Sequence, residues 1–541
     1  MSAVEVKESL GRRTARVMSA VMLGQIANIV ITGVTIILVA RLLGPVDYGI
    51  YVFAFGFASL IDAVGGFGIG TYFNRHLAIH SYSRDTRRMS RTLSSGYVLL
   101  ALSSVAITIL ALLLSGYVSN TLYKSLDIPH ITLITSSLMI LFVMLQAVSV
   151  QALIGLSRGI YSSISGIVGN SIQLAGSVGL IMLGFGVEGA LIGMLLGYAA
   201  SALLATLLVF RSMGQYGGFT FTRPMLWELK ETAKFSFPIG FNTMLNDGMQ
   251  NFSILFLGFY VSKAILGNYG AALKGLSAVI LLHNSINNAL LPAFSTAKLV
   301  KKPQSLHKTY NKVLGYSLIL TLPLLVYLAV FSEPAIYLFL SKSYSTAPTY
   351  LSLILIGAIV NTVSLFISGL IVSRGKTGLV LKYNAIAAVS GLILLLLLTP
   401  RFAVYGNIVA IFLVSNAISI ILMIRGAIRT FGVRFDYMKI LAIFGSNILF
   451  GAVLYALLYL ANASVVNPLS DPVMAAELIL GALAAAALYP VILARTHVMT
   501  LSDIKSLTAA VGHLPMLSAP TTLALRYTKL FIPDVNGSKA N

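Results

Sequence analysis

The 541-residue sequence contains no cysteine, a single tryptophan and few charged residues. Without cysteine the chain forms no disulfide and offers no thiolate for catalysis, iron–sulfur clusters or zinc. Charged residues make up 10% of the chain and hydrophobic residues 57%, whereas about a quarter of the residues in soluble domains are charged. Because the apolar residues stand in long blocks, a soluble protein is excluded and a polytopic membrane protein is predicted.

Acidic residues are also scarce, with 16 Asp and Glu against 37 Lys and Arg and a formal net charge of +21. In a soluble protein such an excess would suggest nucleic-acid binding. Here the basic residues lie singly or in small groups between apolar blocks, as in the cytoplasmic loops of membrane proteins. We therefore expect membrane lipid, and no nucleic acid, around the chain.

The sequence lacks the usual marks of catalysis. No Gly-Lys-Ser/Thr phosphate loop occurs, which disfavours an ATP-driven pump. A membrane-embedded transferase would need paired acids to hold a metal or to act as a base. The acids of the predicted outer loops stand singly, at Asp47, Asp127, Glu188, Glu333 and Asp471. We expect no metal, no catalytic residue and no enzymatic activity.

The apolar blocks predict an all-α protein with about fourteen transmembrane helices, because about 20 apolar residues cross the hydrocarbon core. The spans cover roughly residues 17–40, 49–72, 95–118, 131–155, 160–183, 187–210, 235–259, 264–291, 313–332, 348–372, 380–399, 403–424, 438–461 and 473–494. If the N-terminus is cytoplasmic, the cytoplasmic segments hold 31 Lys and Arg and the outer segments five. This asymmetry predicts that both termini are cytoplasmic.

An internal repeat relates the two halves of the sequence. Residues 154–159 (IGLSRG) resemble residues 370–375 (LIVSRG), and residues 47–49 (DYG) resemble residues 268–270 (NYG). An even number of spans separates the copies, which is typical of a parallel repeat about an axis along the membrane normal. We predict two pseudo-symmetric six-helix lobes around a central cavity, which rock to give alternating access.

The predicted domains follow from this repeat. They are an N-terminal lobe over residues 1–212, a second lobe over 213–430, two additional transmembrane helices over 431–495 and a cytoplasmic tail over 496–541.

Several motifs carry a family resemblance: residues 40–51 (ARLLGPVDYGIY), residues 68–71 (GIGT) followed by Arg75, residues 255–258 (LFLG), residues 267–270 (GNYG) and residues 373–377 (SRGKT). Over roughly residues 15–430 the chain resembles the O-antigen and polysaccharide branch of the multidrug/oligosaccharidyl-lipid/polysaccharide exporter superfamily. The resemblance implies a flippase in the plasma membrane that moves a polyprenyl-phosphate-linked oligosaccharide from the cytoplasmic to the outer leaflet. It is compatible with a glycan polymerase or ligase complex as partner. The chain departs from the family at Gly66, where many members carry an acid, and Asp62 lies one turn earlier.

Lys274 is the basic residue inside a predicted span, where a charge costs about 2.5–3.5 kcal/mol on insertion scales. Positions 274, 277, 281, 284 and 288 follow a spacing of three and four residues, so Lys274, Ser277, Asn284 and Asn288 share one helical face. One interpretation is a substrate-binding face whose lysine anchors a phosphate or pyrophosphate, while the asparagines line the cavity. The other is a structural lysine that pairs with a neighbouring acid.

Asp62 and Asp247 lie deep inside other predicted spans. Asp62 is either a protonation or sodium site that couples transport to an ion gradient, or the counter-charge of Lys274. Asp247 lies in an unusually polar half-span, where Pro238 and Gly248 indicate an irregular helix. It either binds a cation and lines the cavity, or holds helices together. We expect no cofactor, and we leave open whether a proton or sodium gradient drives transport.

The remaining candidate substrate contacts are Gln25, Asn28 and Arg75. Gln25 and Asn28 share a polar face with Thr32 and Thr35, which either hydrogen-bonds sugar hydroxyls or packs against another helix. Arg75 either meets the substrate phosphate at the cytoplasmic entrance or anchors the protein by the positive-inside rule.

The sequence therefore predicts a lipid-linked oligosaccharide flippase. One alternative is an ion-coupled exporter of small amphipathic or cationic compounds from the same superfamily. Another is a non-transporting membrane scaffold of a glycan-assembly complex.

Overall fold

The structure is a computed structural model of the chain. It describes residues 3–65, 68–123, 126–277, 303–373, 376–464, 467–499, 503–504, 527–529 and 531. Throughout these ranges the regular secondary structure is helical and contains no strand. The predicted all-α class is confirmed. The chain divides into two compact units, the first formed by Met1–Gly270 with Thr399–Ala403 and the second by Ala271–Leu398 with Val404–Asn541.

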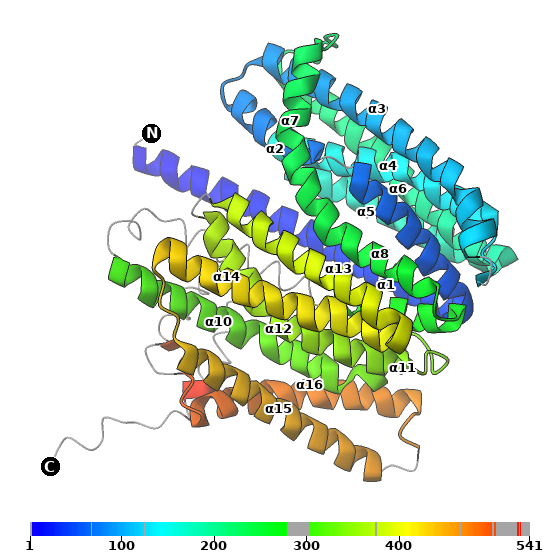
Figure 1. Cartoon of the computed structure of the whole chain (residues 1–541). Coiled ribbons are helices and arrows are strands. Elements are labelled where there is room, and N and C mark those ends of the chain that lie inside the picture. The colour runs from blue at the N-terminus through cyan, green and yellow to red at the C-terminus, as the bar shows by residue number, and fades with distance from the viewer. Residues whose placement is uncertain are drawn as a thin grey trace. The chain divides into compact units, whose positions relative to one another are not determined.

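In the first unit, long helices run side by side as a bundle (Figure 1). They are α1 (Ala3–Gly65), α2 (Ile69–Tyr82), α3 (Thr86–Tyr117), α4 (His130–Gly155), α5 (Gly159–Leu180), α6 (Gly186–Met213), α7 (Leu226–Thr243) and α8 (Met249–Gly258). Local sequence explains their ends. The side chain of Asp85, for example, accepts a hydrogen bond from the Arg88 backbone N–H at 3.0 Å and so caps α3.

The second unit contains the helices of the second half of the chain. They are α10 (Pro303–Val330), α11 (Ser332–Phe339), α12 (Ala347–Ser373), α13 (Thr377–Ile408), α14 (Ser415–Phe431), α15 (Tyr437–Ser464) and α16 (Asp471–Arg495). The tail is attached to this unit through Asp503, which is 3% exposed. Its carboxylate accepts a hydrogen bond from the Tyr316 hydroxyl at 2.7 Å and lies 3.4 Å from Lys439 Nζ. The segment after α16 is therefore held against α10 and α15.

Within the described residues, nine helices are long and apolar enough to cross a membrane. Three of them, Leu23–Ala63, Gly159–Tyr216 and Thr377–Phe431, have 41, 58 and 55 residues. A straight helix as long as the second would extend for about 87 Å, far more than one crossing needs. Each of these segments is long enough for two crossings of about 20 residues. Each is also interrupted by a residue with non-helical backbone angles, where the chain can turn back. The full count of fourteen stays a prediction, since residues 278–302 lie outside the described ranges.

The interruptions coincide with breaks predicted from the sequence. Gly44, directly before Pro45, has φ 69° and ψ 175°. Gly184 has φ 91°, and Ala403, which follows shortly after Pro400, has φ 48°. The polar stretch around Asp247 is also irregular as predicted, because Met244–Gly248 forms a π-helix. Such single-turn bulges lie frequently at functional positions.

The helix boundaries reproduce the internal repeat. α4 begins at His130 and its counterpart α12 at Ala347, while α5 begins at Gly159 and its counterpart α13 at Thr377. The offset along the chain is nearly the same for both pairs. The order of helices thus recurs at nearly constant spacing in these two pairs, as the predicted repeat requires. The predicted two-lobe architecture agrees with this recurrence.

Packing within the first unit uses small residues where helices approach each other closely, while many large apolar side chains face outward. Where α5 meets α6, a Cβ on Gly193 would lie 2.1 Å from the Ser177 backbone nitrogen, so only glycine allows this approach. Leu113 and Leu207, in contrast, are 74% and 63% exposed. The first unit therefore presents an apolar surface to lipid.

Two further glycines bring distant backbone segments into contact. A Cβ on Gly49 would lie 1.9 Å from the Lys263 carbonyl oxygen, and a Cβ on Gly267 would lie 1.9 Å from the Pro45 carbonyl oxygen. The neighbouring Tyr48 and Tyr269 are 1% and 0% exposed. The two copies of the repeated Tyr-Gly motif thus pack against each other within the first unit.

Candidate functional site

The first unit has two opposite ends, which we name by one residue each. The Asp127 end contains the kinks at Gly44 and Gly184 and residues 126–132 and 259–263. The last two segments are joined by the ion pair between Lys263 Nζ and Asp127 Oδ2 at 3.6 Å. At the same end the Thr132 hydroxyl donates to Glu188 Oε1 at 3.0 Å. The Asp85 end contains the α2–α3 and α4–α5 turns and the segment between α6 and α7.

The polar face of α1 forms a hydrogen-bonded seam with α5. Asn28 Nδ2 donates to the carbonyl oxygens of Gly24 at 3.0 Å and Ser163 at 3.2 Å. Asn28 Oδ1 accepts a hydrogen bond from Asn170 Nδ2 at 2.9 Å. Asn28 therefore holds α1 against α5 in this structure, whereas Gln25, on the same face of α1, is exposed.

Asp62 is half-buried in α1 and lies within electrostatic reach of the Tyr198 side chain on α6. Earlier on α1, the Tyr51 hydroxyl contacts Met194 Sδ at 3.2 Å, and the rings of Tyr48 and Tyr51 stack with centroids 5.6 Å apart. The carboxylate of Asp62 thus lies on the α6-facing side of α1, in a tyrosine-rich part of the first unit. The side chain of Asp247 lies outside the described part of the chain.

Arg75 belongs to an aromatic and basic cluster at the Asp85 end. Arg75 Cζ lies 5.3 Å from the centroid of the Phe235 ring, a cation–π distance. The ring of His76 is also 5.3 Å from that of Phe235, and the ring of Tyr72 is 5.7 Å away. The Phe235 ring on α7 thus contacts three side chains of α2, those of Tyr72, Arg75 and His76. Arg75 is exposed, so its guanidinium is accessible to a ligand.

The same cluster perturbs a histidine. Burial lowers the pKa of His76 below the ordinary imidazole value, the nearby His80 and Arg75 lower this pKa further, and Glu231 opposes them. The uncharged form of His76 is therefore favoured in the folded protein, because burial disfavours a charged imidazole and the nearby Arg75 adds repulsion.

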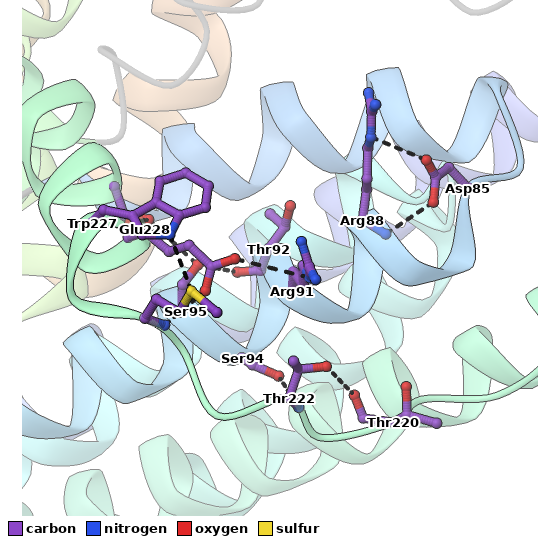
Figure 2. A network of polar contacts seen from close by, with 12 residues as sticks. Asp85, Arg88, Arg91, Thr92, Ser94, Ser95, Thr220, Thr222, Trp227 and Glu228 are labelled. Atoms are coloured by element: carbon purple, nitrogen blue, oxygen red, sulfur yellow. Dashed lines mark hydrogen bonds and ion pairs between the residues drawn. The ribbon is translucent and has the colours of Figure 1, made fainter.

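The segment between α6 and α7 is fastened to α3 by the polar network in Figure 2. The Thr222 backbone N–H donates to Ser94 Oγ at 3.2 Å, and Arg91 Nε lies 4.0 Å from Glu228 Oε1. The Glu228 side chain also accepts a hydrogen bond from the Met225 backbone N–H at 2.8 Å and so caps the N-terminus of α7. This network fixes the start of α7, and α7 in turn carries Phe235 toward Arg75.

Lys274 belongs to the second unit and lies on the helical residues 263–277, where its side chain is half-buried. The neighbouring Gly275 faces Leu351 of α12, with a Cβ position 3.0 Å from a Leu351 methyl carbon. Asn284 and Asn288, predicted to share the face of Lys274, lie outside the described residues. The role of this face stays a prediction.

Two residues of these clusters were not anticipated from the sequence. Asn170 belongs to a stripe on α5 formed by Ser163, Gly166, Asn170, Gln173 and Ser177, spaced three and four residues apart like the stripe on α1. Matching the two stripes would have paired Asn28 with Asn170. Phe235 carries no comparable signal, because one aromatic residue in an apolar helix is ordinary.

Comparison with known sequences gives one family. The sequence profile of a family described as "Polysaccharide biosynthesis protein" matches residues 38–348, more than half of the chain. None of the curated proteins compared with the chain matches its sequence.

Solved structures define the fold. A structure titled "Lipid II flippase MurJ, inward closed conformation" matches with a TM-score of 0.70 and 18% identity, over 88% of this chain and 100% of that one. An inward-facing multidrug resistance MATE family transporter of the MOP superfamily matches with a TM-score of 0.59 and 16% identity, over 74% and 94%. A MOP superfamily transporter from Pyrococcus furiosus, whose title reports reversed polarity of its binding pocket, matches with a TM-score of 0.53 and 16% identity, over 77% and 94%. The chain therefore has the all-α fold of MurJ and MATE transporters.

Proposed function

Because the chain belongs to the polysaccharide biosynthesis protein family, we propose that it is a flippase for a polyprenyl-phosphate-linked oligosaccharide. The observation that carries the proposal is the family match combined with a fold that covers the whole of a lipid II flippase. A lipid-linked saccharide has a polar head and an apolar tail, so a protein that translocates it needs a polar interior within an apolar exterior. The buried serines and the lipid-facing leucines of the first unit fit that requirement.

Charge distribution supports an orientation in the cell membrane with both termini in the cytoplasm. At the Asp85 end and the adjoining helix turns of the first unit lie ten basic residues: Arg75, Arg84, Arg87, Arg88, Arg91, Arg158, Arg211, Arg223, Lys230 and Lys234. The described residues of the Asp127 end contribute Arg41 and Lys263. By the positive-inside rule the Asp85 end is cytoplasmic and the Asp127 end faces outward.

We place the lobe boundary where the repeat places it. α6 ends at Met213 and α14 at Phe431, so lobes over residues 1–212 and 213–430 each end with equivalent helices. The helices α15 and α16 and the tail follow as additions. Rocking of the two lobes would expose a cavity to either leaflet in turn, without covalent chemistry.

Within this mechanism, Lys274 is the proposed contact for the substrate phosphate, and Arg75 is a second contact at the cytoplasmic entrance. A hydrogen bond from a charged group contributes about 1.5–3 kcal/mol in a partly dehydrated cavity. Gln25, with its exposed amide, is a proposed sugar contact. Asn28 would take that role only by exchanging its present bonds to α5.

A second candidate function is ion-coupled export of small cationic or amphipathic compounds. Two observations favour it: the similarity to MATE transporters, and the half-buried carboxylate of Asp62. An exporter of cations would use that acid to exchange a proton or sodium ion against its substrate.

Reconstitution into liposomes tests both candidates. The wild type, Lys274→Ala, Lys274→Arg and the control Lys312→Ala, whose lysine is exposed on α10, are supplied with a fluorescent polyprenyl-diphosphate oligosaccharide. Leaflet exposure is followed with an impermeant quencher. We expect flipping by the wild type and the control, and a loss of about tenfold to a hundredfold in Lys274→Ala that Lys274→Arg partly restores.

The possible results separate the two functions. Flipping that is equal in the wild type and Lys274→Ala would keep the flippase and remove the phosphate role of the lysine. No flipping by the folded wild type, together with gradient-driven efflux of a cationic dye that Asp62→Asn abolishes, would replace the flippase with the exporter.

A further inference from the structure

An open cavity of about 480 Å³ lies at the Asp127 end of the first unit, away from Arg75 at the Asp85 end. Its lining combines Val46, which follows the kink in α1, with Leu126 and the consecutive residues 259–264 after α8. Its volume is within the range of about 300–1,000 Å³ that is typical of small-molecule sites. The aromatic part of the lining is accessible, because Phe259 is 45% exposed and Tyr260 43% exposed.

The walls of this cavity are held rigidly. The ring of Phe259 stacks on Tyr123 with centroids 4.2 Å apart, and the Tyr123 hydroxyl donates to the Leu255 carbonyl oxygen at 2.8 Å. The backbone of Lys263 is pressed against Gly49, where even a methyl group would collide with its carbonyl oxygen. In this conformation the Phe259 ring and the Lys263 backbone are therefore held in place before a ligand binds, which reduces the entropy cost of binding.

Lys263, the charged residue of the lining, forms an ion pair with Asp127, which adjoins the lining residue Leu126. Lys263 Nζ donates to the Asp127 carbonyl oxygen at 2.9 Å and lies 3.6 Å from the Asp127 carboxylate. The Asp127 side chain is 97% exposed, and its backbone has a left-handed φ of 42°, a conformation that costs energy for residues other than glycine. The Asp127 carboxylate is thus held beside Lys263, with acceptor positions open to solvent.

This combination selects a neutral, hydroxyl-rich ligand. A phosphate would meet the Asp127 carboxylate, and a cation would meet the Lys263 ammonium group, so either charged ligand is disfavoured. A sugar ring offers an apolar C–H face for the exposed tyrosine ring, hydroxyl donors for the carboxylate, and hydroxyl acceptors for the ammonium and the Ser262 hydroxyl. A phospholipid acyl chain would form no hydrogen bond with the Asp127–Lys263 ion pair.

We propose that this cavity is a sugar-binding subsite that receives the glycan head of the exported substrate on the outer side of the membrane. Tyr260 supplies the stacking surface, and Asp127 and Lys263 bind hydroxyl groups. The proposal rests on the proposed function, since it assigns a position to the sugar of the same substrate. It adds a second binding position, distinct from the phosphate contacts assigned to Lys274 and Arg75.

Saturation-transfer NMR on the full chain in lipid nanodiscs tests the subsite. The probes are maltotriose, triacetylchitotriose and, as a headgroup competitor, glycerophosphoglycerol. The variants are Tyr260→Ala, Asp127→Asn and the control Tyr117→Ala, whose ring is 55% exposed at the end of α3 and does not line the cavity. Melting of each variant is measured to show that it is folded.

We expect saturation transfer to at least one trisaccharide in the wild type and in Tyr117→Ala. In Tyr260→Ala its dissociation constant should rise by roughly 2- to 12-fold, the effect of losing one aromatic contact. Asp127→Asn, which keeps the shape and removes the charge, should weaken binding in the same direction. Transfer to glycerophosphoglycerol in place of the sugars would overturn the proposal in favour of a lipid headgroup site.

A flipping assay on the same variants keeps this inference separate from the proposed function. If the wild type flips the lipid-linked oligosaccharide, Tyr260→Ala flips it equally fast, and neither trisaccharide binds in a Tyr260-dependent way, the subsite is refuted while the flippase stands. If the sugars bind at Tyr260 and the wild type flips no lipid-linked saccharide, the proposed function fails while sugar binding stands.

Discussion

Gly49 provides the sharpest test of the packing described above. Replacing it with alanine places a carbon 1.9 Å from the Lys263 carbonyl oxygen and 3.1 Å from the Gly267 nitrogen. Carbon and oxygen atoms approach each other at about 3.3–3.6 Å in proteins, so the two segments would have to separate by about 1.5 Å. Because backbone atoms form the obstacle, no side chain can rotate away.

The expected cost of Gly49→Ala follows from this clash. Overpacking of a close contact typically destabilises a protein by about 1–3 kcal/mol, and a backbone clash belongs at the upper end. In a unit of this size that range corresponds to a fall of roughly 2–12 °C in apparent melting temperature, at about 2–4 °C per kcal/mol. The matched control is Gly33→Ala on the same helix, where nothing lies within 4 Å of the added carbon. That change should leave the melting temperature unchanged or raise it slightly, because alanine favours helix.

The assay is thermal melting of the purified variants, followed by size-exclusion chromatography with fluorescence detection. Gly267→Ala should behave like Gly49→Ala, since its added carbon would lie 1.9 Å from the Pro45 carbonyl oxygen. The double variant should cost less than the two single changes together, because one separation of the segments relieves both clashes. A Gly49→Ala protein as stable as Gly33→Ala would refute the contact between the two repeat motifs.

Three further outcomes are expected. Asn28→Ala should lower the free energy of unfolding by about 1–2 kcal/mol, because hydrogen bonds between membrane helices average about 0.6 kcal/mol each and Asn170 loses its acceptor. If the destabilisation of the Asn28→Ala/Asn170→Ala double variant equals the sum of the two single changes, the α1–α5 seam is disproved. Because the pKa of His76 is lowered in the folded protein, stability should fall as pH drops below about 7 through the unfolded value near 6.5, and an unchanged melting-temperature slope in His76→Gln would contradict this. Ser94→Ala removes the acceptor for the Thr222 backbone N–H and should cost about 0.5–1.5 kcal/mol, with faster proteolysis of the α6–α7 segment; equal cleavage rates would argue against the anchoring role.

Features that depend on local sequence were predictable. The break at Gly44 and Pro45 follows from the conformational freedom of glycine and the missing N–H of proline, and the structure has non-helical angles there. The irregular region near Asp247 was expected from Pro238 and Gly248, and a π-helix lies there. The recurrence of helices at a nearly constant offset was visible in short matching motifs, because both copies place them at the same helix junctions.

The candidate contacts were less predictable. The polar faces of α1 and α5 are both apparent in the sequence, yet a stripe does not identify its partner when several helices carry one. The structure pairs Asn28 with Asn170, and this makes a sugar-contacting role for Asn28 dependent on breaking that pair. For Arg75 the sequence offered an entrance or an anchor, and the structure adds the Phe235 ring from α7, a helix far from α2 along the chain.

The sequence by itself determined that this chain lies in a membrane, where its helices begin and bend, and that its halves are related. Each of these depends on the transfer free energy of consecutive side chains or on the backbone preferences of single residues, which are local quantities. Only the tertiary structure decided that Gly49 contacts the Lys263 backbone, that Asn28 pairs with Asn170, and that Asp127 and Lys263 meet beside exposed aromatic rings. These contacts join residues that lie far apart in the sequence, and they arise from the simultaneous packing of several helices, which no single stretch of sequence encodes.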